Sequence, residues 1–137
     1  NIHTLVHEMG HKFYYECLTD DQAKQWKDYY KTRKFREKQE FASKYAMEND
    51  REDFAECFAV YILGEEKINS LYDEKRINKN PEILQKLLLK FKMIAIKPIH
   101  NNIEKQQKLI AQQAKQKAKD SEKRRKEQLK MIANLYR

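Results

Sequence analysis

Apolar residues recur three and four positions apart in four segments of the chain, and this spacing predicts amphipathic helices. The segments are residues 5–13, 26–33, 54–61 and 83–91. In the first, Leu5, Val6, Met9 and Phe13 predict a buried face. In the second, we expect a core face. Its members are Trp26, Tyr29, Tyr30 and Arg33. We expect the last segment to pack its apolar face against the helices at residues 5–13 and 54–61, which carry the candidate chemistry. Its apolar members are Ile83, Leu84, Leu87, Leu88 and Phe91.

Residues typical of helix ends lie where these segments begin and stop. The start signals are a capping box at Thr19–Gln22, a cap at Asn49 or Asp50, and Asn80 followed by Pro81; the stop signal is Gly64. With only two glycines and two prolines in 137 residues, the chain is expected to be mainly α-helical. Cys17 and Cys57 provide no disulfide framework, and both are expected to be buried thiols.

The composition changes at Lys97-Pro98, which predicts a boundary between residues 1–97 and residues 98–137. Residues 101–137 hold 11 basic and 4 acidic residues, and so account for +7 of the chain's net charge of +8. We expect a long basic helix that packs on a protein partner; a solvated helix or a disordered charged tail are the alternatives. No heptad repeat is sustained, so a coiled coil is not expected. Nucleic-acid binding is not expected either, because the Lys123–Lys126 cluster lacks interleaved aromatic residues. No apolar run is long enough for a membrane span.

The most informative motif is His7-Glu8-Met9-Gly10-His11, an HExxH pattern. Residues four apart share one face of a helix, so two imidazoles can bind the same zinc ion while Glu8 reaches a water beside it. An ordinary amphipathic helix can carry the same pattern. Gly10 indicates close packing, because glycine lowers helix propensity. His3 is expected to start the helix near the site, with a direct contact to the metal as the less favoured alternative, and no role is expected for His100.

A catalytic zinc site needs a third protein ligand, and the best candidate segment for it is residues 45–61. Glu52 and Glu56 are four residues apart in the segment that begins at Asn49, so they share a face. Each has a simpler interpretation. Glu52 also fits the third position of a capping box, and Glu56 also fits a solvated helix carboxylate.

Together the HExxH motif and the pattern Tyr-x6-Glu-x-Phe-Ala-Glu at residues 45–56 resemble the gluzincin peptidases of the anthrax lethal factor type, a group that includes the clostridial Pro-Pro endopeptidases. The resemblance covers about residues 1–96. It implies a Zn²⁺ ion held by His7, His11 and Glu52. It also implies Tyr45 as the transition-state hydrogen-bond donor and Glu56 as a neighbour of the metal site. Asp53 departs from the family, where this position tends to be apolar.

The resemblance implies a zinc endopeptidase acting on a protein or peptide, with Glu8 as general base. The expected fold is the C-terminal helical part of a zincin-like domain, followed by the long basic helix. Such peptidases place a small sheet before the HExxH helix, and no strand pattern is found here. We therefore expect an upstream segment or another chain to complete the substrate groove. The alternative is a structural or assembly component of a large complex, such as a virus particle, that carries a zincin-like module. The sequence does not indicate a compartment.

Overall fold

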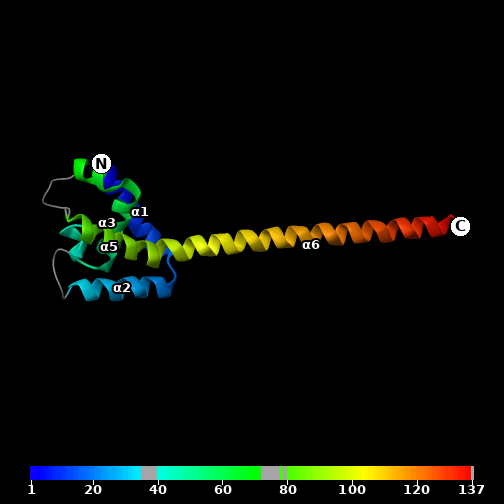
Figure 1. The fold of residues 1–137 in the computed structure, drawn as a ribbon, viewed down its shortest axis with the longest axis horizontal. Coiled ribbons are helices and arrows are strands. Elements are labelled where there is room, and N and C mark those ends of the chain that lie inside the picture. Colours follow the sequence, from blue (N-terminus) through cyan, green and yellow to red (C-terminus); the bar gives the residue numbers. More distant parts are fainter. Residues whose placement is uncertain (35–39, 72–77, 79, 137) are drawn as a thin grey trace. The chain divides into compact units, whose positions relative to one another are not determined.

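The structure is a computed structural model that describes residues 1–34, 40–71, 78 and 80–136 (Figure 1). The elements are α1 (Ile2–Cys17), α2 (Asp20–Lys34), η2 (Tyr45–Met47), α3 (Asp50–Leu63), α4 (Glu65–Leu71), α5 (Pro81–Phe91), η3 (Lys92–Ile96) and α6 (Lys97–Leu135). Within these described residues no strand is found, and the prediction of a mainly helical protein is confirmed. The chain divides into two compact units, Asn1–Pro98 and Ile99–Arg137.

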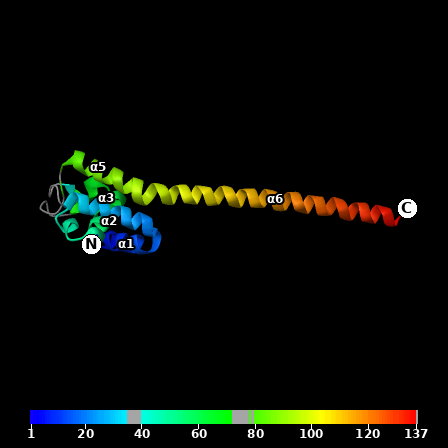
Figure 2. The same ribbon diagram turned by 90° about the horizontal axis from the view of Figure 1, so that it is seen from below.

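Helix α3 is the centre of the first unit. It packs against α1, α2, α4, α5 and the η2 turn, and Figures 1 and 2 show it among these helices. Every residue of α3 from Asp53 to Val60 is buried, which is the pattern of a helix covered on all sides. Phe54 lies at the middle of an aromatic cluster, with ring centroids 5.5 Å from Trp26 and 5.1 Å from Phe91. The predicted core faces of residues 26–33 and 83–91 are therefore confirmed.

Helices α2, α3 and α5 begin at the predicted caps, and each cap satisfies backbone N–H groups that a helix start leaves unpaired. Thr19 Oγ1 accepts from the N–H of Gln22 at 3.1 Å, and Gln22 Oε1 accepts from the N–H of Thr19 at 2.8 Å. Asn49 and Asn80 accept with their side chains at the starts of α3 and α5. Gly64 ends α3 with φ +81°, a conformation that favours glycine.

Asp53, the departure from the gluzincin pattern, is fully buried on α3 and forms an ion pair with Arg33 of α2. The Arg33 guanidinium also lies 4.2 Å from the ring centroid of Tyr29 and 4.7 Å from that of Phe41. Burial raises the pKa of Asp53 to about 6, although the charge of Arg33 opposes this rise. The core face predicted for α2 can thus include the charged Arg33, because Asp53 of α3 is its counter-ion.

Pro98 lies inside a helix, where its missing N–H leaves the carbonyl four residues earlier without its usual donor. That carbonyl belongs to Ile94, and the side-chain amide of Gln22 donates to it at 3.2 Å. The preceding turn is π-helical, with the N–H of Lys97 donating to the carbonyl of Lys92. Gln22 therefore has two roles. It is part of the α2 cap, and its side-chain amide donates to the carbonyl that Pro98 leaves without a donor.

Three predictions of burial are wrong. Leu5 and Met9 are 61% and 49% exposed, because α1 packs on α3 through the side that carries His3, His7 and Gly10, and the two apolar residues lie on the other side. Cys17 is exposed as well. Tyr14 donates a hydrogen bond of 3.0 Å to Asp50, the first residue of α3. Cys17 follows Tyr14 on α1 and therefore lies past the N-terminal end of α3. Cys57 is buried, as predicted.

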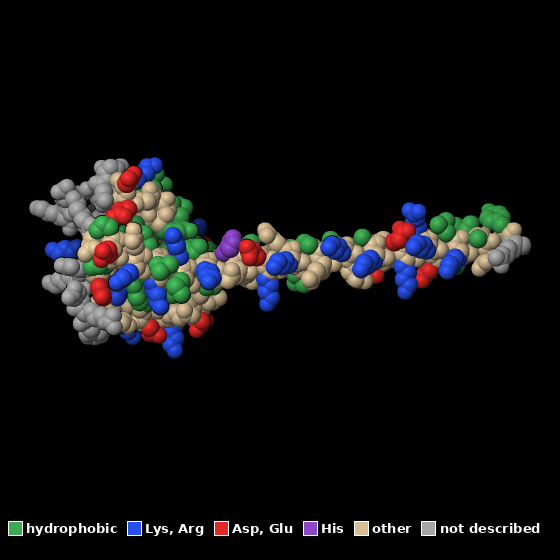
Figure 3. Space-filling model, viewed as in Figure 1, with side chains coloured by type: hydrophobic (Ala, Val, Ile, Leu, Met, Phe, Trp, Pro, Cys, Tyr) green, Lys and Arg blue, Asp and Glu red, His purple; other side chains and the backbone are tan. Residues whose placement is uncertain are grey.

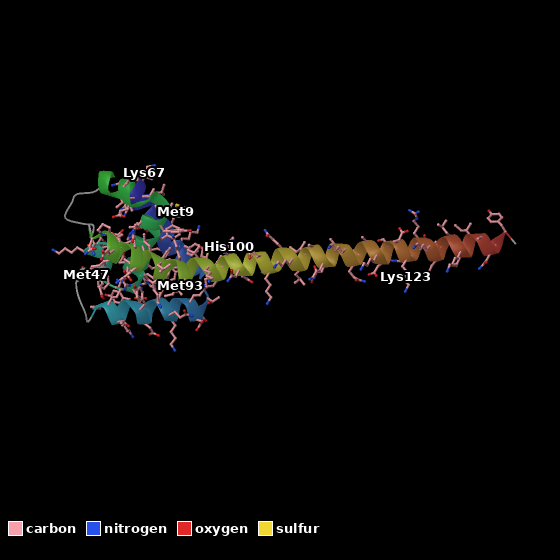
Figure 4. All side chains as sticks on the ribbon, viewed as in Figure 1. Met9, Met47, Lys67, Met93, His100 and Lys123 are labelled. Atoms are coloured by element: carbon pink, nitrogen blue, oxygen red, sulfur yellow. The ribbon has the colours of Figure 1, made fainter. Side chains whose placement is uncertain are left out.

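The second unit holds the part of α6 that follows Pro98, and its described residues from His100 to Tyr136 are exposed. Figure 3 shows Lys and Arg side chains along α6 with apolar side chains between them, and Figure 4 marks His100 and Lys123 on it. His100 pairs with Glu104 of its own helix at 3.1 Å. None of the helices in the described part of the chain is both long and apolar enough to cross a membrane.

Candidate metal centre

Helix α1 brings three histidines to the side that faces α3. The side chain of Asn1 accepts from the N–H of His3 at 2.9 Å and so caps the helix at its first turn. His3 and His7 are buried, and His11 is half-buried. Residues four apart stack on one face of a helix, so the three imidazoles form a row.

Gly10 allows α3 to lie unusually close to this row. A Cβ atom at Gly10 would lie 2.9 Å from the Cα of Ala55 and 3.0 Å from the Cβ of Phe58. Real Cβ atoms essentially never show contacts under 3.0 Å. The predicted reason for this glycine, close packing of its helix, is therefore confirmed.

Helix α3 supplies the two carboxylates. The Oδ1 of Asn49 accepts from the N–H of Glu52 at 2.9 Å, which confirms Asn49 as the cap and fixes the backbone of the first turn. Glu52 is half-buried and Glu56 is buried one turn later on the same face. The N–H of Glu52 thus belongs to the cap, but its carboxylate, which a capping box would turn back to the N–H of Asn49, faces the histidines instead.

Three atoms converge on one point between the helices. His7 Nε2 lies 2.7 Å from Glu52 Oε2, His11 Nε2 lies 3.1 Å from the same oxygen, and the two nitrogens are 3.1 Å apart. Zinc binds imidazole nitrogen and carboxylate oxygen at about 2.0–2.2 Å, and tetrahedral geometry then separates the ligand atoms by roughly 3.4 Å. The observed distances of 2.7, 3.1 and 3.1 Å are shorter than this, by roughly 0.3–0.7 Å. The kinds of donor fit zinc, and the three atoms would have to move slightly apart to hold it.

Glu56 holds the far side of His7. Its Oε2 lies 3.2 Å from His7 Nδ1 and 2.8 Å from His3 Nε2, and its Oε1 accepts from Ser43 Oγ at 2.8 Å. Burial alone would raise the pKa of Glu56, but the hydrogen bonds from His3, His7 and Ser43 lower it to about 2. Glu56 is therefore a carboxylate surrounded by donors, not the solvated side chain of the simpler interpretation.

The charge state of His7 follows from these neighbours. Burial acts to lower its pKa, but the hydrogen bonds and negative charges of Glu56 and Glu52 outweigh this effect and raise the pKa. Two carboxylates thus favour a positive charge at this imidazole. A second proton or a metal cation at Nε2 supplies that charge, because Nδ1 faces Glu56.

Tyr45 lies beside the same point, at the start of the η2 turn. Its ring centroid is 5.6 Å from that of His7, and 51% of the residue is exposed. The turn is anchored on both sides, since Ser43 Oγ accepts from the N–H of Ala46 at 3.1 Å and Tyr30 donates to the carbonyl of Met47 at 2.7 Å. The charge of Glu52 raises the pKa of the Tyr45 phenol, so the phenol keeps its proton.

The structure thus brings together five of the six predicted site residues: His7, His11, Tyr45, Glu52 and Glu56. The sixth, Glu8, follows His7 on α1 and is exposed. Sequence reasoning missed Ser43 entirely and left His3 without a defined contact. His3 carried a signal, the four-residue spacing from His7. The only signal for Ser43 in the sequence is its position two residues before Tyr45. That position becomes informative once Glu56 is known to need a donor besides the histidines.

Comparison with protein-family models, with curated proteins and with solved structures finds no match to this chain.

Proposed function

We propose that this chain is a zinc-dependent endopeptidase with a zincin-like site. The observation that carries the proposal is the convergence of His7 Nε2, His11 Nε2 and Glu52 Oε2 within 2.7–3.1 Å of one another. Structural zinc sites usually have four protein ligands, whereas catalytic sites have three and leave one position open. Three donors, of which His7 is buried while His11 and Glu52 are only partly buried, favour the catalytic kind.

Zinc supplies Lewis-acid chemistry at such a site, because it polarises a peptide carbonyl and makes water acidic enough to attack near neutral pH. Glu8 is the general base in this proposal. It follows the ligand His7, and its exposed carboxylate has access to solvent water and substrate. It takes the proton from the attacking water and passes it to the leaving amine.

Tyr45 is the hydrogen-bond donor in this proposal. Its phenol stays protonated beside Glu52, and half of its surface is open to a substrate. A donor directed at developing negative charge contributes about 3–4 kcal/mol to the transition state in comparable enzymes. A site that only held zinc for stability would need neither Tyr45 nor Glu8.

A second role, assembly through α6, has an observation of its own. Large apolar residues are exposed along this helix, at Ile103, Ile110, Leu129 and Ile132. They are separated from the metal ligands in sequence, so a protein partner bound by α6 does not compete for the same residues. Binding of such a partner is expected to persist in a Glu8→Gln variant.

The test of the endopeptidase proposal is cleavage of a proteome-derived peptide library by the zinc-loaded chain, read by mass spectrometry. Glu8→Gln keeps the three ligands and is expected to keep zinc while losing cleavage by a factor of about 10²–10⁴. Glu16→Gln, an exposed glutamate on the same helix, is the matched control. Equal cleavage by wild type and Glu8→Gln at equal zinc content would show that Glu8 is not the base. Absence of any cleavage by the zinc-loaded wild type would favour the assembly role.

A further inference from the structure

The carboxylate of Glu56 joins three parts of the first unit. Its oxygens contact His3 and His7 on α1 and Ser43 in the segment before η2, while the residue itself belongs to α3. All four residues are buried, with exposed fractions of 6–7%. A buried carboxylate needs a full set of donors, since removal from water is costly. Each donor therefore restricts where the carboxylate lies.

The hydrogen bonds have a fixed direction. A carboxylate can only accept, so His3 Nε2, His7 Nδ1 and Ser43 Oγ must all donate to Glu56. Ser43 is itself oriented, because its oxygen accepts from the N–H of Ala46 and its single proton is left for Glu56 Oε1. The result at His7 is a proton on Nδ1, which leaves Nε2 as the atom that faces His11 and Glu52.

We propose that His3 and Ser43 are positioning residues of the metal site, which hold the Glu56 carboxylate so that it fixes the ring and tautomer of His7. This inference rests on the proposed function, since it assumes a metal at His7, His11 and Glu52. Partners of a metal-bound histidine typically change metal affinity 10- to 100-fold when they are removed. Here the partner of His7 is Glu56, and Glu56 is itself held by His3 and Ser43. Loss of His3 or Ser43 is therefore expected to lower metal affinity through Glu56.

A competing possibility is that His3 binds a metal directly. His3, His7 and Glu56 offer donor atoms within 4.8 Å of one another. This set would take Nδ1 of His7, and Ser43 already occupies the other oxygen of Glu56. All three members are buried, so the set leaves no open position for a substrate. The set of His7, His11 and Glu52 is the more exposed one, and His3 remains a support.

The test measures zinc affinity of the full chain by competition with a chelator of known affinity. Ser43→Ala and His3→Leu remove one donor each and are expected to weaken zinc binding 10- to 100-fold while one zinc per chain is still bound at saturation. Ser121→Ala and His100→Leu make the same substitutions on α6 and are the matched controls, expected to leave affinity unchanged. Ser43→Thr and His3→Gln keep a donor, and they are expected to recover most of the lost affinity.

Two further readouts separate positioning from general damage and from ligation. The melting temperature of the metal-free variants shows whether the fold survives; if Ser43→Ala does not fold, His3→Leu decides. Cobalt(II) in place of zinc reports the ligand set through its visible spectrum, which is expected to stay that of the wild type. Unchanged affinity in both variants would overturn the inference and leave the proposed function standing. Loss of stoichiometry or a changed spectrum in His3→Leu would make His3 a ligand and also overturn it. A wild-type chain that binds no metal would overturn both.

Discussion

Gly10→Ala tests the close contact between α1 and α3 on which the candidate metal site depends. The new Cβ would meet the Cα of Ala55 at 2.9 Å, the Cβ of Phe58 at 3.0 Å and the carbonyl oxygen of Ala55 at 3.2 Å. Two of these atoms belong to the backbone of α3, so no side-chain rotation relieves the clash. Overpacking of this kind costs about 1–3 kcal/mol.

The opposing effect is intrinsic helix propensity. Alanine is about 1 kcal/mol more favourable than glycine inside a helix. Because backbone atoms cannot give way without moving the helix, we expect the upper part of the overpacking range, and a net loss of about 1–2 kcal/mol in the free energy of unfolding. Separation of the helices also lengthens the distances from His7 and His11 to Glu52, so zinc affinity is expected to fall with stability.

Chemical denaturation followed by circular dichroism measures the first effect, and chelator competition measures the second. Gly64→Ala is a control of a different kind: a Cβ added there would meet no atom of the described residues within 4 Å, but the φ of +81° makes alanine strained. It is expected to lose stability with unchanged zinc affinity. If Gly10→Ala instead raised stability by about 1 kcal/mol, the full propensity gain, and left zinc affinity unchanged, the contact between α1 and α3 would be refuted.

Three further variants test other parts of the structure. Arg33→Met leaves Asp53 buried without its counter-ion and is expected to cost about 3–5 kcal/mol of unfolding free energy, whereas Arg33→Met with Asp53→Leu is expected to recover most of it. Gln22→Ala removes both a cap acceptor and the donor to the carbonyl that Pro98 leaves open, for a loss of about 1–3 kcal/mol by denaturation; the loss is expected to shrink in a Pro98→Ala background. Tyr45→Phe is expected to lower kcat by about 10²–10³ at unchanged zinc affinity.

Each of these three predictions has a result that would contradict it. A double variant at residues 33 and 53 no more stable than the single one would mean that the loss lies in the aromatic contacts of Arg33 and not in the unpaired carboxylate. An equal loss of stability from Gln22→Ala with and without Pro98 would show that the Gln22 amide does not stabilise the fold through the Ile94 carbonyl. Normal kcat in Tyr45→Phe would remove the phenol from the mechanism.

Much of the fold and most of the candidate site follow from local rules that a sequence displays. The caps at Thr19, Asn49 and Asn80 act over two or three residues, and the four-residue spacing of His7 and His11 places both on one face. Glu52 could be proposed as the third ligand because its spacing from Tyr45 and Glu56 matches the gluzincin pattern. Gly10 could be interpreted because an unfavourable residue in a helix requires a packing reason.

What could not be predicted depends on contacts between distant segments. The burial of Asp53 is comprehensible only once Arg33 is known to lie against it, 20 residues away in sequence. Ser43 becomes a site residue through a hydrogen bond to Glu56, and no local pattern announces that bond. The exposure of Leu5 and Met9 has the same origin, since apolar spacing predicts an apolar face but not which neighbour covers it.

The central claim is that His7, His11 and Glu52 together bind one zinc ion. Elemental analysis of the purified and dialysed chain, beside a Glu52→Gln variant, tests it without any substrate. We expect one zinc per wild-type chain and a large loss of zinc from the variant under the same dialysis. A wild-type chain that retains no zinc even after reloading at neutral pH, or a variant that retains it as well as the wild type, would show that these three residues do not form the zinc site.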